Sequence, residues 1–158
     1  MELSDILYTV LLAVLPISEL RGAIPYAFFK GMSLWGAALL SIAGNMLVQP
    51  LFYIFISTFH KLLYVHWSFY QRIFDKTLAR ARAKVSKQID KYGYWGLMVF
   101  VGIPLPLTGA WTGTLGAWIL GLKRGKSFLF ISLGLVMSAI IVSLILFTGV
   151  GINSIFIK

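Results

Sequence analysis

Four apolar blocks, at residues 6–29, 32–57, 94–122 and 127–152, make up most of this chain. A helix needs about 20 predominantly apolar residues to cross a bilayer. The second and fourth blocks meet this length and predict two spanning helices. Prolines and polar residues divide the first and third blocks into legs of about ten to sixteen residues, which at 1.5 Å per residue are too short or barely long enough to cross. Each broken block is therefore a candidate for a re-entrant hairpin.

The two interruptions lie about one repeat apart along the chain. Pro16 and Pro25 frame the first, and Pro104 and Pro106 mark the second. Backbone without regular helix is tolerated at membrane depth only where it is buried in protein or lines a watery cavity. A shift of 90 residues also superposes a set of identical residues: Leu15/Leu105, Pro16/Pro106, Ala27/Ala117, Gly31/Gly121, Leu39/Leu129 and Gly44/Gly134. The same order of hairpin, loop and span at one offset indicates an internal repeat.

The distribution of basic residues favours hairpins over four spanning blocks. Eleven of the fourteen Lys and Arg residues lie in two places: Lys61, Arg72, Lys76, Arg80, Arg82, Lys84, Lys87 and Lys91 in the central linker, and Lys123, Arg124 and Lys126 in a short loop. Four spanning blocks would place these groups on opposite faces, whereas two hairpins place them on the same face. Because basic loops stay cytoplasmic, we expect the basic linker in the cytoplasm and both termini extracytoplasmic, in the inner (cytoplasmic) membrane.

The predicted fold is an all-α integral membrane protein. It is an inverted-topology repeat of two re-entrant helical hairpins, each followed by a transmembrane helix. Residues 1–158 form a single membrane domain, with repeats at 5–58 and 93–152 and a linker at 59–92. The linker places Leu78, Ala81, Val85, Ile89 and Tyr92 at helical spacing between basic residues. This pattern suits an interfacial amphipathic helix that contacts anionic headgroups, or a plain connector whose charges fix topology.

The composition agrees with a membrane protein and excludes several function classes. The chain is 59% hydrophobic and 12% charged, against about 25% charged in soluble domains. It has no cysteine, so disulfides and thiolate metal sites are excluded, and no nucleic-acid recognition motif accompanies the net charge of +9. His60 and His66 have no acidic neighbours for a metal site. No P-loop, GxSxG or HExxH motif is present, so we expect neither an enzyme nor a cofactor.

Glu19 and Arg21 are the only charged residues in the four apolar blocks. A charge at membrane depth is costly and suggests a functional site. A buried carboxyl group favours its neutral form, so Glu19 is a candidate to bind and release a proton near neutral pH. Arg21 is always charged and suits phosphate or carboxylate. The alternative is a static ion pair, which extended backbone near the prolines would allow.

The residues around this pair suggest an anion pocket. Gly22 lets backbone N–H groups approach a ligand, and a helix that begins near it would add a positive dipole end. The second interruption offers Thr108, Thr112 and bare glycine backbone. The same small residues also let helices pack closely, and this alternative stays open.

Three further residues are candidates for the same site. Asn45 and Gln49 lie four residues apart on the first predicted spanning helix, so they share one face. They suit either ligand contact or hydrogen bonding between helices. Trp111 suits gating or stacking on a ligand, or simple packing.

The motif Glu19-x-Arg21-Gly22-x-x-Pro25, with Pro104 and Pro106 and the Gly/Thr/Trp run after them, resembles the small multidrug export protein family. The resemblance implies a short branch of the DedA superfamily, which includes the VTT-domain lipid scramblases. The resemblance implies the hairpin fold and a membrane-potential or proton-linked movement of lipid-like substrates. For DedA transporters the substrate class is polyprenyl phosphate, and Glu19 would be the acidic residue of the first half. The second interruption has no arginine, which departs from the DedA pattern.

The leading hypothesis is a proton-coupled transporter or flippase for an amphipathic substrate with an anionic head. Arg21 would hold the head and Glu19 would couple protonation to transport. A proton-coupled exporter of lipophilic cations and a non-transporting membrane scaffold are the alternatives. Two spanning helices are few to enclose a pathway, so we expect a homodimer in contact with membrane lipids.

Overall fold

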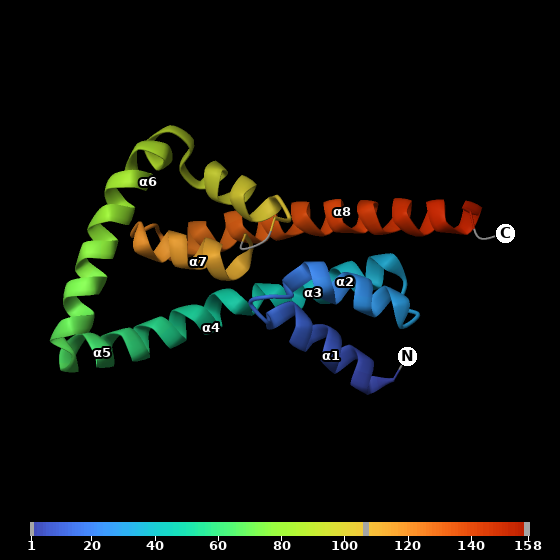
Figure 1. Ribbon diagram of the computed structural model, residues 1–158, viewed down its shortest axis with the longest axis horizontal. Helices are drawn as coiled ribbons and strands as arrows, with labels where there is room; N and C mark the ends of the chain where they lie inside the picture. Colours follow the sequence, from blue (N-terminus) through green and yellow to red (C-terminus); the bar gives the residue numbers. More distant parts are fainter. Residues whose placement is uncertain (1, 106–107, 157–158) are drawn as a thin grey trace.

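The computed structural model describes residues 2–105 and 108–156, with side-chain detail outside residues 61, 73–74, 77–91 and 150–156. The described residues form helices and the turns that join them, and no strand occurs among them (Figure 1). The elements are α1 (Leu3–Val14), α2 (Glu19–Phe29), α3 (Leu34–Met46), α4 (Val48–Phe55), the π-helical turn η1 (Ile56–His60), α5 (Lys61–His66), α6 (Ser68–Gly102), α7 (Ala110–Ile119) and α8 (Arg124–Phe156). The prediction of an all-helical chain is confirmed.

Two helical stretches of the described chain are long and apolar enough to cross a membrane. They are Leu34–His66, which runs from α3 to α5, and Arg124–Gly149 in α8. Large apolar side chains on both stretches point away from the protein, among them Leu39 (67% exposed) and Phe147 (68% exposed). An apolar outer surface of this kind suits contact with lipid. The first stretch extends beyond the predicted block at 32–57.

The first of these stretches is interrupted near its middle. Its helix ends at Met46, and a new helix begins at Val48. Leu47 donates its N–H to the carbonyl of Gly44 (3.2 Å), three residues back instead of four. Pro50 explains the interruption, because it has no N–H to donate to the carbonyl of Met46 and its ring crowds that carbonyl. The backbone hydrogen bonds are therefore not continuous from α3 to α4, and the position of one helix relative to the other depends on packing.

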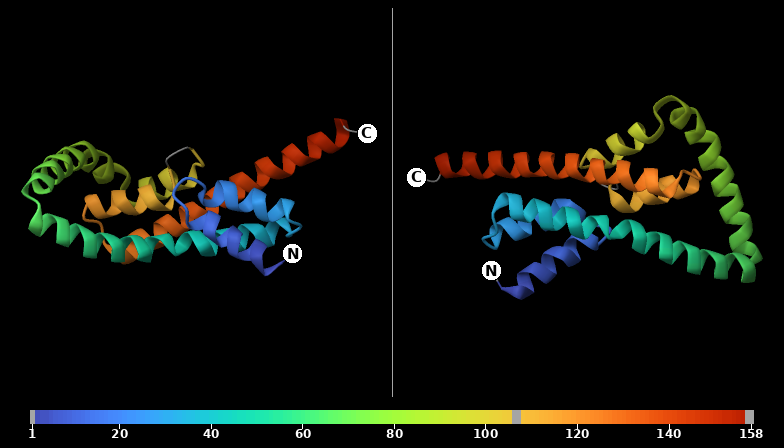
Figure 2. Two further views of the ribbon diagram at one scale, coloured as in Figure 1. Left: turned by 60° about the horizontal axis from the view of Figure 1, so that its bottom comes forward. Right: turned by 180° about the vertical axis from the view of Figure 1, so that it is seen from behind.

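The broken blocks form two helical hairpins whose tips meet. Residues 15–18 join α1 to α2, and residues 103–109 join the end of α6 to α7. Figure 1 shows the two tips together at the centre of the molecule, with the arms of the two hairpins extending toward opposite ends, and Figure 2 shows the same arrangement from two other directions. The stretch α3–α4 and helix α8 run past both tips in opposite directions.

The same backbone hydrogen bonds recur 90 residues apart. Gly31 donates to Phe28 (3.0 Å), and Gly121 donates to Trp118 (3.0 Å). Both glycines have positive φ angles, +91° and +65°, a conformation that lets a helix end and the chain reverse. Ser18 to Leu15 (3.2 Å) and Thr108 to Leu105 (3.1 Å) form a second matched pair, at the hairpin tips.

Pro25 corrects one expectation from the sequence. It was predicted to mark a hairpin break together with Pro16, Pro104 and Pro106, but it lies inside α2. The helix loses the bond to the carbonyl of Arg21, an effect of about 3 kcal/mol in an exposed helix. Burial of Leu20, Ile24 and Ala27 on the core side of α2 offsets this loss. Pro16 and Pro104 do lie in the breaks, and Pro106 is outside the described residues.

The linker is helical along most of its length. Helix α6 changes direction at Gly93, which has a φ of +52°, and its first part runs across one end of the bundle (Figures 1 and 2). Tyr92 beside this bend is 56% exposed. Leu78, Ala81, Val85 and Ile89, which define the predicted amphipathic face, lie outside the described side chains, so that face stays a prediction.

Small residues allow the helices to approach closely in the core. A Cβ atom on Gly134 of α8 would lie 2.6 Å from the carbonyl oxygen of Met98 in α6. On α3, a Cβ on Gly44 would lie 3.0 Å from the Cβ of Ala13 in α1. In each half, a glycine thus lets the long helix contact the first arm of the hairpin, the kind of packing that small residues provide in membranes.

We predict that Gly134→Ala destabilises the fold by about 1–3 kcal/mol, because the new methyl group meets backbone that cannot rotate away. Thermal unfolding in detergent measures this loss. Gly116→Ala is the matched control, since Gly116 is also helical and nothing lies within 4 Å of its Cβ position. That variant should be unchanged or slightly stabilised, and equal losses in both variants would contradict the packing argument.

Candidate functional site

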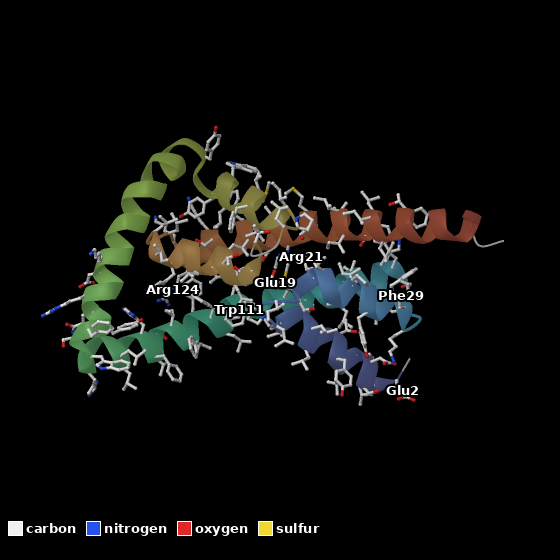
Figure 3. The ribbon with its side chains drawn as sticks, in the orientation of Figure 1. Glu2, Glu19, Arg21, Phe29, Trp111 and Arg124 are labelled. Carbon is white, nitrogen blue, oxygen red and sulfur yellow. The ribbon has the colours of Figure 1, made fainter. Side chains whose placement is uncertain are left out.

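Glu19 lies where the two hairpin tips meet (Figure 3). It is the first residue of α2 and is 5% exposed. Its φ angle is +47°, a left-handed conformation that costs a residue other than glycine on the order of 1–3 kcal/mol. This backbone sets the direction in which the side chain leaves the first hairpin. The surrounding contacts therefore hold Glu19 in a conformation that the isolated chain would avoid.

The Glu19 carboxylate interacts with two groups from different hairpins. Its Oε1 accepts a hydrogen bond from the backbone N–H of Trp111 (3.4 Å) in the first turn of α7. Its Oε2 lies 3.9 Å from Nη2 of Arg21 in α2. The N-terminus of a helix carries a partial positive charge, so both neighbours favour the ionised form of the carboxyl group.

Gly109, immediately before α7, provides the space for this carboxylate. A Cβ atom at Gly109 would lie 1.6 Å from Oε2 of Glu19, and the φ of Gly109 is +150°. Both the space and the backbone conformation therefore require glycine. Gly109 lies 90 residues after Glu19, so the two residues occupy positions related by the 90-residue offset. These two residues are in contact.

Two side chains cross between the hairpins in a reciprocal manner. Arg21 donates from Nη2 to the carbonyl oxygen of Thr108 at the second tip. Trp111, 90 residues after Arg21, donates from Nε1 to the carbonyl oxygen of Val14 (2.8 Å) at the first tip. Each bond satisfies a carbonyl that the end of a helix or a tip leaves without a helical partner. These contacts join the two tips around Glu19.

The remaining predicted residues of the tips have local roles in this structure. The Thr108 hydroxyl donates to the carbonyls of Ile103 (2.7 Å) and Leu105 (2.8 Å) and so stabilises the second tip. The Thr112 hydroxyl donates to the carbonyl of Gly109, the residue immediately before α7 (3.4 Å). A Cβ at Gly22 would lie 2.1 Å from Oγ of Ser18, so this glycine admits the serine side chain.

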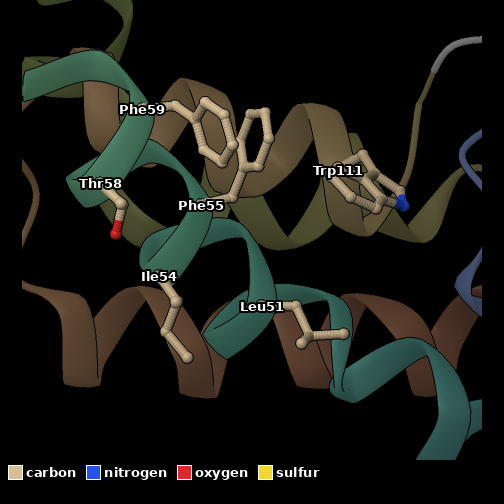
Figure 4. Close-up of a pocket in the computed structure, with 6 residues that line it drawn as sticks. All are labelled: Leu51, Ile54, Phe55, Thr58, Phe59 and Trp111. Carbon is tan, nitrogen blue, oxygen red and sulfur yellow. The ribbon is translucent and has the colours of Figure 1, made fainter. Parts of the chain in front are cut away.

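Two pockets flank the contact between the tips. One, of about 240 Å³, is lined by Arg21, Pro25, Pro104, Val142, Ile145 and Leu146. The other, of about 490 Å³, is lined by Leu51, Ile54, Phe55, Thr58, Phe59 and Trp111. Figure 4 shows Trp111 at one end of the larger pocket and Thr58 and Phe59 at the other.

The two pockets share two pairs of positions that are related by the 90-residue offset. Arg21 and Trp111 differ by 90 residues, and so do Phe55 and Ile145. Each pocket combines the long helix of one half with the hairpin of the other half. Their chemistry differs, because one pocket has a guanidinium on apolar walls and the other has aromatic and aliphatic walls.

Asn45 and Gln49 are buried on the long stretch α3–α4, at 0% and 1% exposure. Gln49 donates from Nε2 to Oγ of Ser132 in α8 (3.3 Å). The Asn45 amide and the Gln49 carbonyl oxygen have no hydrogen-bond partner among the described residues. A buried polar group without a partner costs about 1–3 kcal/mol. The structure does not join these two residues to Glu19 by a direct bond.

The protonation of Glu19 depends on where Arg21 lies. Burial favours the neutral carboxyl group, whereas the guanidinium and the N–H of Trp111 favour the carboxylate. Arg21 is the one charged side chain within 4 Å of this carboxylate in the described part of the chain. Its own side chain is 27% exposed and lines a pocket, so a ligand in that pocket would compete with Glu19 for it.

The sequence identified Glu19, Arg21, Thr108 and Trp111, and the structure brings these four residues together. The sequence offered Gly109 as part of the bare backbone of the second interruption, but it did not predict the contact of this glycine with Glu19 or the pocket walls on α4 and α8. The offset of 90 residues between Glu19 and Gly109 is the signal that could have indicated the contact.

Comparison with known families identifies the chain. A family model described as "Putative small multi-drug export protein" matches residues 19–141. The chain belongs to this family. The match begins at Glu19, the first residue of α2, and runs through the second hairpin tip into the first half of α8. A comparison with curated proteins finds no match, and neither does a comparison with solved structures.

We predict that Gly109→Ala destabilises the protein by about 1–3 kcal/mol more than Gly121→Ala, because its methyl group overlaps the Glu19 carboxylate. Gly121 is the matched control, since it also has a positive φ but nothing lies within 4 Å of its Cβ position. Thermal unfolding of both variants measures the difference.

A double variant isolates the contact itself. In the background Glu19→Ala, the additional change Gly109→Ala should cost about 0.5–3 kcal/mol less than it does in the wild type. Equal costs in the two backgrounds would show that backbone strain alone makes Gly109 necessary.

Proposed function

We propose that this member of the small multi-drug export family is a proton-coupled secondary transporter whose substrate passes the contact between the two hairpin tips. The observation that carries the proposal is the buried Glu19 carboxylate at that contact, with a pocket on either side. Paired interruptions in corresponding positions of two halves, together with a charge at membrane depth, are typical of transporter sites.

The proposed architecture is an inverted repeat of two re-entrant hairpins with two spanning helices. The opposite directions of α3–α4 and α8 support it, as do the backbone hydrogen bonds that recur at an offset of 90 residues. The repeats are residues 5–58 and 93–152 of one membrane domain, and residues 59–92 form the linker. In this arrangement the two pockets are alternative binding positions for one substrate. One pocket is open while the other is closed.

The leading substrate class is an amphipathic molecule with an anionic head, such as a polyprenyl phosphate. The guanidinium of Arg21 on the apolar wall of the smaller pocket supports this choice. An anion in that pocket draws Arg21 away from Glu19. The carboxyl group then loses its positive neighbour and takes up a proton, so anion and proton bind together and are transported in the same direction.

The second candidate substrate class is a lipophilic cation. The family description and the aromatic walls of the larger pocket favour it, because Trp111 and the Phe55–Phe59 pair offer faces for a cation. A cation and a proton would compete for the charge of Glu19. Transport would then be an exchange of the two, and the direction of proton movement distinguishes the two candidates.

We place the chain in the inner (cytoplasmic) membrane as a multi-pass protein with extracytoplasmic termini and a cytoplasmic linker. The first part of α6, which crosses one end of the bundle, and the eight basic residues of the linker support this orientation. We further propose a homodimer, because two candidate spans and two hairpins enclose a pathway only in part.

Glu19→Gln should abolish transport driven by a pH gradient and leave the protein folded, because glutamine keeps the shape but cannot titrate. Arg21→Lys should slow transport of a polyprenyl phosphate at least about tenfold, since a point charge replaces a fork with two donors. Flux into liposomes, thermal stability and membrane level are measured side by side. The control is Asp5→Asn, which removes the carboxylate that pairs with Lys30 (3.3 Å) at the far end of the first hairpin.

A purely structural ion pair would give a different result. Each single substitution at Glu19 or Arg21 would then abolish the membrane level of the protein, and removal of both charges would restore that level. Full pH-driven transport by Glu19→Gln would reject proton coupling through this residue.

Single cysteines at Ser4, Ser68 and Gly125 test the orientation, because the chain has no native cysteine and these three residues are exposed. An impermeant thiol reagent added outside intact cells should label position 4 alone. After the cells are opened, it should also label positions 68 and 125. Labelling of position 68 from outside would contradict the hairpin topology.

A further inference from the structure

The stretch α3–α4 has a line of buried polar residues that its counterpart lacks. Ser41, Asn45 and Gln49 follow one another at intervals of four residues, at 0%, 0% and 1% exposure. The positions 90 residues later on α8 are Ile131, Leu135 and Ala139, which are also buried, at 0%, 1% and 2%. The same three core positions are therefore polar in one half and apolar in the other. At these three positions helix packing does not require a polar residue, since apolar residues occupy the equivalent positions of α8.

Four polar atoms on this line have no hydrogen-bond partner among the described residues. They are Oγ of Ser41, Oδ1 and Nδ2 of Asn45, and Oε1 of Gln49. Some other buried hydroxyls bond within their own helices, as Thr9 does to Asp5 (2.7 Å) and Thr114 to Ala110 (2.6 Å). Single hydroxyls at Tyr53, Ser127 and Ser143 also lack a partner in the described part of the chain, but the α3–α4 line places four such atoms on three successive turns. Buried polar groups that lack protein partners are usually bonded to ordered water.

The chemistry of the four atoms favours water over a metal ion. The oxygen atoms accept hydrogen bonds, but Nδ2 of Asn45 donates and would repel a cation. Water both donates and accepts, and a buried water molecule makes two to four hydrogen bonds. Along the helix axis, residues 41 and 49 are separated by about 12 Å, a length that a short chain of water molecules covers.

This segment of the helix passes the contact between the hairpin tips. Gly44, beside Asn45, packs on Ala13 next to the first tip. Phe52, one turn beyond Gln49, packs edge-to-face on Trp111 with ring centroids 5.9 Å apart. Trp111 donates its backbone N–H to Glu19. Ser41 lies toward the start of α3, the end of the stretch that the proposed orientation places on the extracytoplasmic side.

We propose that Ser41, Asn45 and Gln49, with Ser132, hold a chain of bound water that delivers protons from the extracytoplasmic side to Glu19. The proposal rests on the proton-coupled transport proposed above. It assigns the proton path to the first half of the protein, separate from the pocket beside Arg21. The interruption at Leu47 and Pro50 lies within this path, at a place where discontinuous helices in transporters expose polar backbone.

Cysteine reactivity tests the water chain without any transport measurement. Ser41→Cys and Thr9→Cys place single thiols at two positions that are both 0% exposed. Methyl methanethiosulfonate reacts with the thiolate, which forms only where water solvates it, so adducts counted by intact mass should form at least about tenfold faster at position 41 than at position 9. Equal rates would overturn the water chain.

A second variant tests the delivery of protons. Asn45→Leu combined with Gln49→Ala copies the residues of the second half, and it should slow pH-driven flux at least about tenfold while substrate binding at fixed pH is unchanged. Thr9→Val is the control and should transport like the wild type. Unchanged flux in the double variant would overturn the proton path even if position 41 is reactive. A wild-type protein without pH-driven flux would overturn the proposed function and the proton role with it, whereas the cysteine comparison would still decide whether the line is hydrated.

Discussion

The contact between the Glu19 carboxylate and the backbone of Gly109 is the constraint on which the centre of this protein depends. A buried carboxyl group must have polar neighbours, and here one is the N-terminus of α7 in the opposite hairpin and the other is Arg21 in its own helix. Gly109 admits the oxygen atoms because it has no Cβ. The backbone of Glu19 is left-handed at this contact, with a φ of +47°. One interaction therefore sets the distance between the hairpins, the backbone at both tips and the environment of the acidic group.

The reciprocal bonds of Arg21 and Trp111 extend this contact to the two pockets. Each side chain is anchored on the opposite tip and also lines a pocket. A ligand that moves either side chain would disturb the junction between the hairpins. In the proposed transport cycle this relation links occupancy of a pocket to the state of Glu19. The two halves share a backbone plan but differ in chemistry, with a cation on one side and an indole on the other. Such asymmetry gives a substrate a preferred side.

The long helices differ in the same way. Helix α8 is continuous and apolar at its buried positions 131, 135 and 139, whereas α3–α4 is interrupted by Pro50 and polar at 41, 45 and 49. Polar groups without protein partners in a core are costly, and four such atoms lie along α3–α4 beside the hairpin tips, the observation on which the proposed water chain rests. The glycines at 44 and 134 serve both halves alike. The glycine packing is thus repeated in both halves, whereas the core positions 41, 45 and 49 are polar and their equivalents 131, 135 and 139 are apolar.

The sequence by itself determined the helical class, the two candidate spans, the positions of the breaks at Pro16 and Pro104, and the choice of Glu19 and Arg21 as candidate site residues. Apolar length, the missing N–H of proline and the cost of a charge in lipid are local properties, and they can be read without a fold. Only the tertiary structure decided that Pro25 stays within α2, because burial of its helix offsets the lost bond. It also decided the partners of Glu19, since Gly109 and Trp111 are about 90 residues away and are brought to it only by the packing of the two hairpins.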